Sequence, residues 1–211
     1  MAKPADRRRR RAPRAACASS AWREGWWRAA RRCGSPNQGA RPAGEAVTLA
    51  IVHSISLPPG VYGGPQVEQF FGNRLDGRAH PYFEGLQGLR VSAHFFIRRD
   101  GRTLQFVSCD RRAWHAGVSR WGGRDRCNDF SIGIELEGLE GLRFEQAQYR
   151  RLARLLDALS RRHPLRWAVG HEHVAPGRKG DPGEGFDWVR LRRLLGRASP
   201  LQLPQDVAPA E

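Results

Sequence analysis

The chain has 211 residues, of which 40% are hydrophobic, a length and apolar share that suit one domain with some residues to spare. No apolar run approaches the ~18 to 20 residues that a membrane span requires, so we expect a soluble protein. The formal net charge is +15, and residues 1–42 hold 12 basic and 2 acidic residues. Because a run of like charges is usually a solvated segment, no nucleic-acid partner is required to explain this excess.

The cysteines give no sign of a metal knuckle or a redox motif. They are irregularly spaced and form no CxxC pair, so we predict reduced thiols at Cys17, Cys33, Cys109 and Cys127. The arginine-rich N-terminus lacks the apolar segment of ~7 to 15 residues that an export signal contains. We therefore expect a cytoplasmic protein.

Composition divides the chain into three parts. Residues 1–24 are basic and alanine-rich, which is typical of a disordered extension. The compact domain is expected over residues 25–196. Residues 197–211 are predicted to form a disordered C-terminal tail.

The first predicted elements are short. Residues 48–53, TLAIVH, form an apolar run typical of a buried strand that ends at His53. A proline opens a predicted two-turn helix at residues 65–71. Residues 91–107 carry Asp-Gly at 100–101 between two β-rich arms, which predicts a hairpin with a two-residue loop.

The second half alternates strands and helices. Residues 129–138 place apolar side chains on one face and carboxylates on the other. Leucines at helical spacing predict a helix over 144–163. A strand is expected at 166–171, ending in a histidine, and a closing helix at 186–195. Because the hairpin is antiparallel and the other strands alternate with helices, we predict one α/β domain with a central mixed β-sheet flanked by α-helices.

The segment GHEHVAPGRKGDPG, residues 170–183, is dense in reactive side chains and turn residues. Two predicted strands end in histidine, His53 and His171, and ligands gather where the strands of α/β sheets end. Catalytic zinc takes three protein ligands, often two histidines and a carboxylate, so Asp181 is the expected third ligand. His173 is an alternative to His171, because the two share a face if the strand continues.

Seven ordered blocks resemble a known family. They are closely similar to the AmpD-type zinc-dependent N-acetylmuramoyl-L-alanine amidases, which have the amidase type 2, or peptidoglycan-recognition-like, fold. The likeness runs from about Gly25 to about Leu195. The blocks are AIVHSISLPPG, GGP, HPYF, LRVSAHFFIRRDG, RAWHAGVS, RCNDFSIGIELEG and GHEHVAPGRKGDPG.

The resemblance implies roles for particular residues. His53, His171 and Asp181 match zinc ligands, with one zinc ion per chain. Glu135 matches the catalytic carboxylate, and Lys179, the only lysine besides Lys3, matches a residue that stabilises the transition state. The remaining matches are assigned to substrate binding, and they are Tyr82, Arg90, His115, Arg126 and Arg178. His173 departs from the family, which commonly has aspartate there.

The implied reaction is hydrolysis of the amide between the lactoyl group of anhydro-N-acetylmuramic acid and L-alanine. Its substrate is an anhydro-muropeptide or another peptidoglycan fragment recovered in the cytosol, and we expect a monomer. One alternative is an amidase that acts on intact peptidoglycan. A second is a peptidoglycan-binding module without activity, which the complete set of ligands disfavours.

Overall fold

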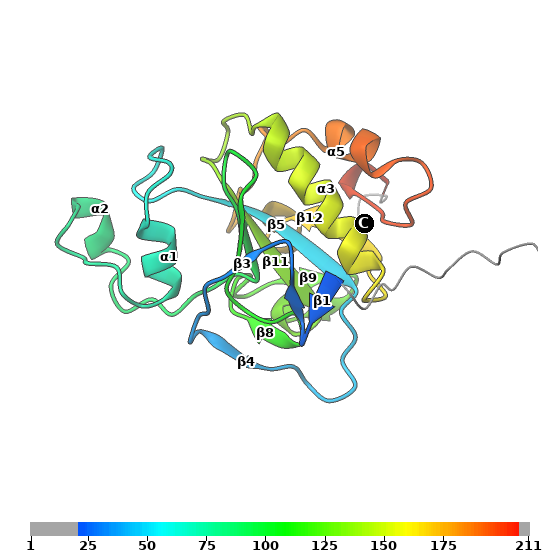
Figure 1. Cartoon of the computed structure of the whole chain (residues 1–211), viewed down its shortest axis with the longest axis horizontal. Coiled ribbons are helices and arrows are strands. Elements are labelled where there is room, and N and C mark those ends of the chain that lie inside the picture. Colours follow the sequence, from blue (N-terminus) through cyan, green and yellow to red (C-terminus); the bar gives the residue numbers. More distant parts are fainter. Residues whose placement is uncertain (1–20, 207–211) are drawn as a thin grey trace, which may run out of the picture.

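The computed structural model describes residues 21–206, and the predictions for residues 1–20 and 207–211 lie outside this range. The regular elements follow one another along the chain (Figure 1). They are β1 Trp22–Arg23, β2 Trp26–Trp27, β3 Arg31–Arg32, β4 Gln38–Ala40, β5 Leu49–Ile55, α1 Gln66–Phe71, α2 Pro81–Glu84, β6 Phe95–Ile97, β7 Thr103–Gln105, β8 Arg111–Ala113, β9 Arg120–Trp121, β10 Arg124–Asp125, the 3₁₀ turn η2 Cys127–Asp129, β11 Ser131–Glu137, α3 Gln146–Ser160, β12 Trp167–Gly170, α4 His171–Val174, α5 Trp188–Leu195 and the 3₁₀ turn η3 Pro204–Asp206.

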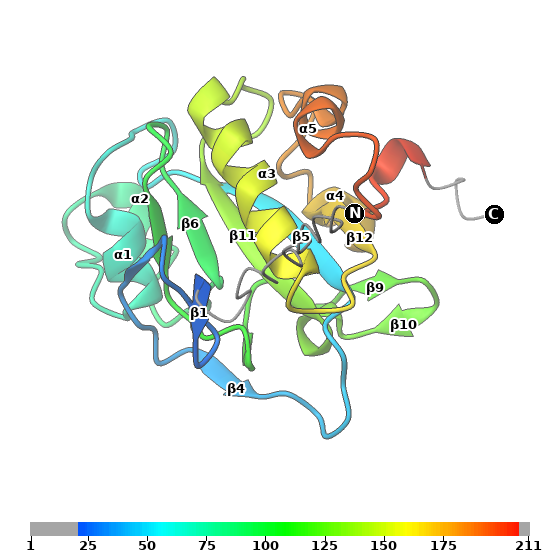
Figure 2. The ribbon, with the colours of Figure 1, turned by 45° about the vertical axis from the view of Figure 1, so that its right-hand side comes forward.

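A six-stranded mixed sheet organises the fold, with the strand order β12-β5-β11-β6-β7-β3. The pairs β12–β5, β5–β11 and β11–β6 are parallel, whereas β6 and β7 run antiparallel. Helices α3 and α5 lie across one face, and α1 and α2 lie together to one side of the sheet (Figure 2). The predicted α/β architecture with a mixed sheet is confirmed.

The central strands β5 and β11 separate a packing face from a face that carries polar groups. Ile132, Ile134 and Leu136 of β11 share the largest core cluster with the leucines of α3. The alternate residues point the other way, because successive side chains of a strand face opposite sides. On that side Glu135 is in register with His53 of β5.

Helix α3 was predicted from its apolar spacing, and its leucines are fully buried: Leu152, Leu155, Leu156 and Leu159. Its start is tied to the sheet by the side chain of Gln148. The amide Nε2 donates to the carbonyls of Ile97 and Glu137, and Oε1 accepts the N–H of Glu145. This buried amide fixes where the helix meets β6 and β11.

The hairpin between β6 and β7 differs from the expected two-residue loop. The N–H of Arg98 donates to Arg102 O, and the N–H of Gly101 donates to Arg98 O, which leaves three residues in the loop. Gly101 has φ +84°, the left-handed conformation that closes three-residue hairpin loops. The Asp-Gly pair therefore marks the turn but not its length.

The folded body extends beyond both predicted boundaries. At the N-terminal side, β1 begins before residue 25 and Trp22 is buried against Trp27 and Phe95. At the C-terminal side, residues 201–203 run beside β12, where Ala168 N–H donates to Gln202 O and Gln202 N–H donates to Arg166 O. A disordered extension to residue 24 and a disordered tail from residue 197 were therefore wrong over the described residues, because apolar anchors lie within both segments.

The anchoring of the C-terminal segment can be measured. Leu203 is fully buried, so Leu203→Ala should lower the free energy of unfolding by about 2–5 kcal/mol. Leu142 is 51% exposed, and Leu142→Ala should cost about 0.5 kcal/mol or less. Urea unfolding of both variants tests this, and equal losses would contradict the packing of the segment.

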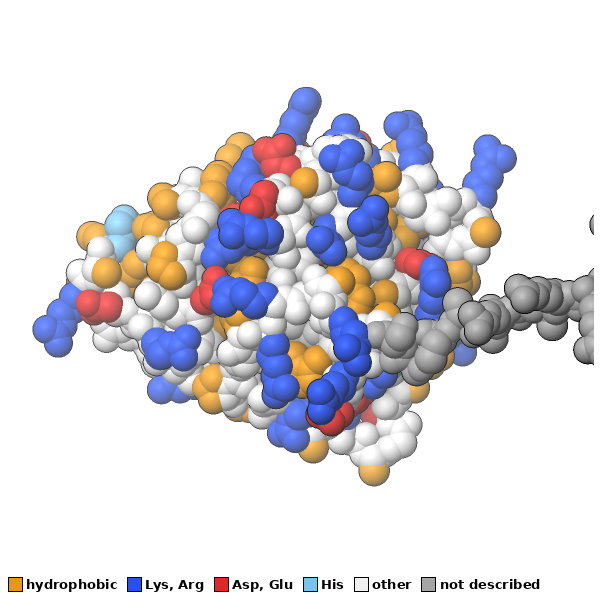
Figure 3. Space-filling view, viewed as in Figure 1, with side chains coloured by type: hydrophobic (Ala, Val, Ile, Leu, Met, Phe, Trp, Pro, Cys, Tyr) orange, Lys and Arg blue, Asp and Glu red, His pale blue; other side chains and the backbone are white. Residues whose placement is uncertain are grey.

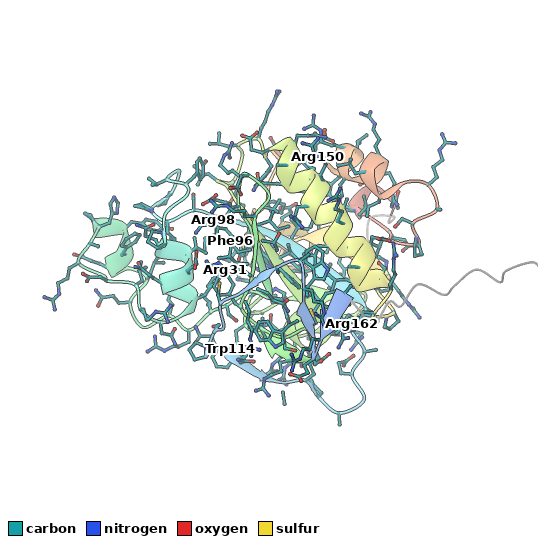
Figure 4. All side chains as sticks on the ribbon, in the orientation of Figure 1. Arg31, Phe96, Arg98, Trp114, Arg150 and Arg162 are labelled. Carbon is teal, nitrogen blue, oxygen red and sulfur yellow. The ribbon has the colours of Figure 1, made fainter. Side chains whose placement is uncertain are left out.

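Much of the net positive charge lies in the folded body. Residues 21–206 contain 29 basic and 19 acidic residues, so the excess is not confined to an N-terminal extension. Arginines are spread over the face that carries α3 (Figure 3). Arg150 lies near the start of that helix and Arg162 comes shortly after its last residue (Figure 4), and the guanidinium of Arg162 lies 5.6 Å from the ring centre of Trp22. Within the described residues, no helix is long and apolar enough to cross a membrane.

Candidate metal centre and active site

Three side chains far apart in the sequence converge at one end of the central strands. His53 Nδ1 lies 3.0 Å from His171 Nδ1 and 3.1 Å from Asp181 Oδ2. His171 Nδ1 lies 3.1 Å from Asp181 Oδ1. One potential ligand atom from each residue lies within 4.8 Å of the others. The three predicted ligands therefore form one cluster.

Each member of the cluster is positioned by its own element. His53 is the fifth of the seven residues of β5, where its ring faces away from α3. His171 opens the short helix α4 directly after β12. The loop returns to it because the N–H of Glu172 donates to Asp181 O at 3.0 Å. The glycine with φ +73° at Gly177 allows the sharp turn in between.

The donor set fits a zinc ion. His171 Nε2 lies 3.2 Å from the carbonyl oxygen of Ala116, and a carbonyl only accepts hydrogen bonds. That nitrogen therefore carries a proton, which leaves Nδ1 as the ring atom that can present a lone pair to the cluster. Burial lowers the pKa of His53 to about 4, so this ring is neutral. Two imidazoles and a carboxylate form a set of three protein ligands typical of catalytic zinc.

His173 does not belong to the cluster. The chain turns into α4 at His171 instead of continuing the strand, so the two histidines do not share a face. His173 Nδ1 accepts the N–H of Gly170 at 3.1 Å, and its ring packs 5.9 Å from that of Trp188. The alternative ligand is thereby excluded by the helical turn.

This assignment predicts a contrast between two variants. Asp181→Ala should lose zinc, because two imidazoles alone hold the ion weakly. His173→Ala should keep a full zinc complement, since its ring is committed to Gly170 and Trp188. Atomic emission after gel filtration gives the zinc-to-protein ratio. A zinc-free His173→Ala protein that is still folded would contradict the assignment.

Glu135 lies in the same cleft as the cluster and is 8% exposed. Its Oε2 is buried and has no hydrogen-bond partner among the described residues. Burial raises the pKa of this carboxyl well above its usual range. The Asp181 carboxylate raises it further, whereas the ammonium of Lys179 lowers it. A buried carboxylate with a free oxygen and a raised pKa is suited to proton transfer.

The cleft has a volume of about 470 Å³ and includes four more of the predicted site residues, namely Lys179, Arg178, Tyr82 and His115. Lys179 and Arg178 come from the loop after α4, and Tyr82 projects from α2 with 47% of its surface exposed. Arg178 Nη2 donates to Ala116 O at 2.7 Å and to Val118 O at 2.6 Å. It therefore holds the loop at 116–118 against the site.

Two predicted substrate-binding arginines lie outside this cleft. Arg90 lines an adjoining hollow of about 330 Å³, which shares Phe70 and Leu86 with the cleft. Arg126 is exposed, and its guanidinium lies 3.4 Å from Asp129 Oδ2. The structure therefore does not bring these two side chains to the metal cluster, and their roles in binding stay predictions.

His115 lines the cleft, but both of its ring nitrogens contact other protein atoms. Nδ1 lies 3.0 Å from His53 Nε2, and Nε2 lies 3.2 Å from Ser131 Oγ. Ser131 and the Ala116 carbonyl were not predicted as site residues from the sequence. A backbone carbonyl has no side-chain signature, so only the observation that RAWHAGVS forms one matched block pointed to this segment.

Comparison with known proteins identifies the family. Residues 43–184 match the family model described as N-acetylmuramoyl-L-alanine amidase. The chain therefore belongs to the N-acetylmuramoyl-L-alanine amidase family, a family of hydrolases.

Individual relatives resemble the chain over most of its length. It is 53% identical to the 1,6-anhydro-N-acetylmuramyl-L-alanine amidase AmpD of Citrobacter freundii over 178 residues, which cover 83% of this chain and 95% of that protein. A crystal structure of a selenomethionine AmpD derivative matches with a TM-score of 0.79 and 52% identity, covering 82% of this chain and 98% of the other. The amidase AmiD of Escherichia coli, in complex with anhydro-N-acetylmuramic acid-L-Ala-D-gamma-Glu-L-Lys, matches with a TM-score of 0.52 and 28% identity, covering 73% of this chain and 60% of that one.

Proposed function

We propose that this protein uses a zinc ion to hydrolyse the amide between the lactoyl group of 1,6-anhydro-N-acetylmuramic acid and L-alanine of the stem peptide. The observation that carries the proposal is the convergence of His53, His171 and Asp181 in one cleft with Glu135, whose Oε2 has no hydrogen-bond partner within residues 21–206. The choice of substrate is supported by the AmpD relatives, whose name specifies the anhydro sugar. Their lengths are almost wholly covered by this chain.

The mechanism follows from the position of each group. His53, His171 and Asp181 would hold the zinc ion, which supplies a Lewis acid that lowers the pKa of a water towards ~7 and polarises the substrate carbonyl. Glu135 takes the proton of the attacking water on its free oxygen. It then delivers this proton to the departing alanine nitrogen, since an unprotonated amide nitrogen is a very poor leaving group.

Lys179 stabilises the charge that develops on the substrate. This role is supported by the cleft wall, in which Lys179 lies together with Glu135 and the metal cluster. Negative charge builds on the carbonyl oxygen as the tetrahedral intermediate forms, and a cation fixed beside it lowers the barrier. The cleft in front of these groups, with a volume of about 470 Å³, can admit part of a sugar-linked peptide.

We also place the reaction in the cytosol, on fragments released by cell-wall turnover. The thiols of Cys33, Cys109 and Cys127 are free, as is usual in a reducing compartment. We propose that the monomer is active, because one chain supplies the three metal-binding side chains and Glu135.

The decisive experiment compares three substrates. Zinc-loaded protein is incubated with an anhydro-muropeptide, with the same muropeptide carrying a reducing sugar, and with intact sacculi, and mass spectrometry follows the free peptide. We expect rapid release from the anhydro-muropeptide. Cleavage of sacculi alone would favour an amidase that acts on intact peptidoglycan and would overturn the proposed role in recycling. Binding without cleavage of any of the three substrates would favour a peptidoglycan-binding module without activity.

A further inference from the structure

The dipeptide His115–Ala116 lies directly behind both metal-binding histidines. The side chain of His115 meets the outer nitrogen of His53, with 3.0 Å between the two nitrogens. The carbonyl of Ala116 meets the outer nitrogen of His171 at 3.2 Å. Two adjacent residues thus contact the two imidazoles at the atoms that face away from the cluster.

Hydrogen-bond direction gives these contacts a chemical meaning. The Ala116 carbonyl can only accept a hydrogen bond, so it selects the tautomer of His171 that carries the proton on Nε2. If His115 donates Nε2–H to Ser131 Oγ, its Nδ1 is an acceptor and selects the same form of His53. The Nδ1 lone pairs of His53 and His171 then both point into the cluster. If instead Ser131 donated to His115 and His115 donated to His53, the proton of His53 would lie on Nδ1 and would block metal binding.

Hydrogen bonds and close packing hold the dipeptide His115–Ala116 in place. A single acceptor, Asn128 Oδ1 in η2, takes the N–H groups of His115 and Ala116 at 3.1 and 2.9 Å. The ring of His115 fits over Gly133 of β11, where a Cβ atom would lie 2.4 Å from His115 Cγ. A glycine in the central strand and an anchoring amide thereby fix both contacts at once.

We infer that His115 and Ala116, anchored by Asn128, are positioning residues that preset the ring form and orientation of both zinc-binding histidines. His115 would therefore act through His53 and not by binding substrate. The inference rests on the proposed zinc site and adds the groups that prepare it. Partners of this kind typically change metal affinity by about 10- to 100-fold when they are removed.

The test measures zinc affinity by competition with a chromogenic chelator, using full-length zinc-loaded protein. His115→Phe keeps a ring of similar size but removes the acceptor, and its zinc affinity should fall by about 10- to 100-fold. Asn128→Ala should weaken binding in the same direction, because the N–H groups of His115 and Ala116 lose their acceptor. Asn128→Asp keeps that acceptor and should restore binding close to that of the unchanged protein.

A spectroscopic measurement gives a second readout that loss of folding cannot imitate. In ¹⁵N-histidine-labelled protein with zinc bound, a scalar coupling across the hydrogen bond should join His53 Nε2 to His115 Nδ1, with the proton on His53. A proton on His115 Nδ1 would overturn the inference. So would folded His115→Phe and Asn128→Ala proteins that bind zinc as tightly as the unchanged chain. Asp181→Ala tests the zinc site separately. This variant should lose zinc whether or not His115 and Ala116 position the ligands, and an Asp181→Ala protein that keeps its zinc would show that the zinc site itself is wrong.

Discussion

Replacing Glu135 by glutamine should reduce turnover at least ~10²-fold while zinc stays bound, which is the lower range of the effect expected for a general base. The amide is close in shape to the carboxyl, but it cannot accept the proton of the attacking water. Because burial already disfavours the charged form of Glu135, the neutral side chain should not lower thermal stability. Release of peptide from anhydro-muropeptide, zinc content and Tm are measured together.

The matched control is Glu137→Gln. Glu137 lies two residues away on the same strand, but its carboxylate accepts from Gly63 N–H, Arg98 and Arg99 N–H. Glu137→Gln should therefore lower Tm, whereas its turnover should stay close to that of the unchanged enzyme. The pH profile adds a check, because Glu135 must be ionised to act as a base and its pKa is raised. Activity of the unchanged enzyme should decline, as the pH falls, at a higher pH than for an ordinary glutamate, and equal activity of Glu135→Gln would remove this residue from the mechanism.

Exchange of Lys179 for arginine should lower turnover by about 10²-fold although the charge is kept, similar to the loss of one donor to an oxyanion. An ammonium is a compact point charge, whereas a guanidinium is planar and spreads its charge over a fork. The larger group cannot occupy the same place beside the carbonyl oxygen. The KM for the muropeptide should change less than turnover, because the interaction strengthens only as the charge develops.

Arg143→Lys is the control, because it also exchanges arginine and lysine but at a position away from the cleft. Arg143 is exposed and outside the cleft, so neither turnover nor KM should change. If Lys179→Arg were as active as the unchanged enzyme, the stabilising role of the ammonium would be refuted. If it altered KM alone, Lys179 would act in binding.

Periodicity and turn residues were sufficient to predict the main architecture. The buried strand β5, the alternating strand β11 and helix α3 have strong patterns, because both a sheet face and a helix stripe must be covered by apolar groups. The ends were missed for a related reason. Isolated anchors such as Trp22, Leu201 and Leu203 lie in segments whose average composition is that of a tail.

The candidate site was accessible from the sequence only in part. Histidines near strand ends suggested the metal cluster, whereas the choice between His171 and His173 depended on a helical turn that the pattern did not show. The resemblance pointed to Glu135 and Lys179. The supporting contacts of Ala116 and Asn128 were invisible, since a carbonyl and a loop amide acquire a role only when the chain brings them behind the ligands.

Residues 201–203, which meet β12 through an isolated bridge between Gln202 and Trp167, affect the solubility of the protein. β12 is the outermost strand of the sheet on its side, and its free backbone groups would offer a template on which other chains could assemble. The hydrogen bonds of Gln202 to Arg166 and Ala168 shield part of that border. A shortened chain that stops at Gly196 would leave it bare, so such a chain should aggregate on storage even if its catalytic cleft were intact.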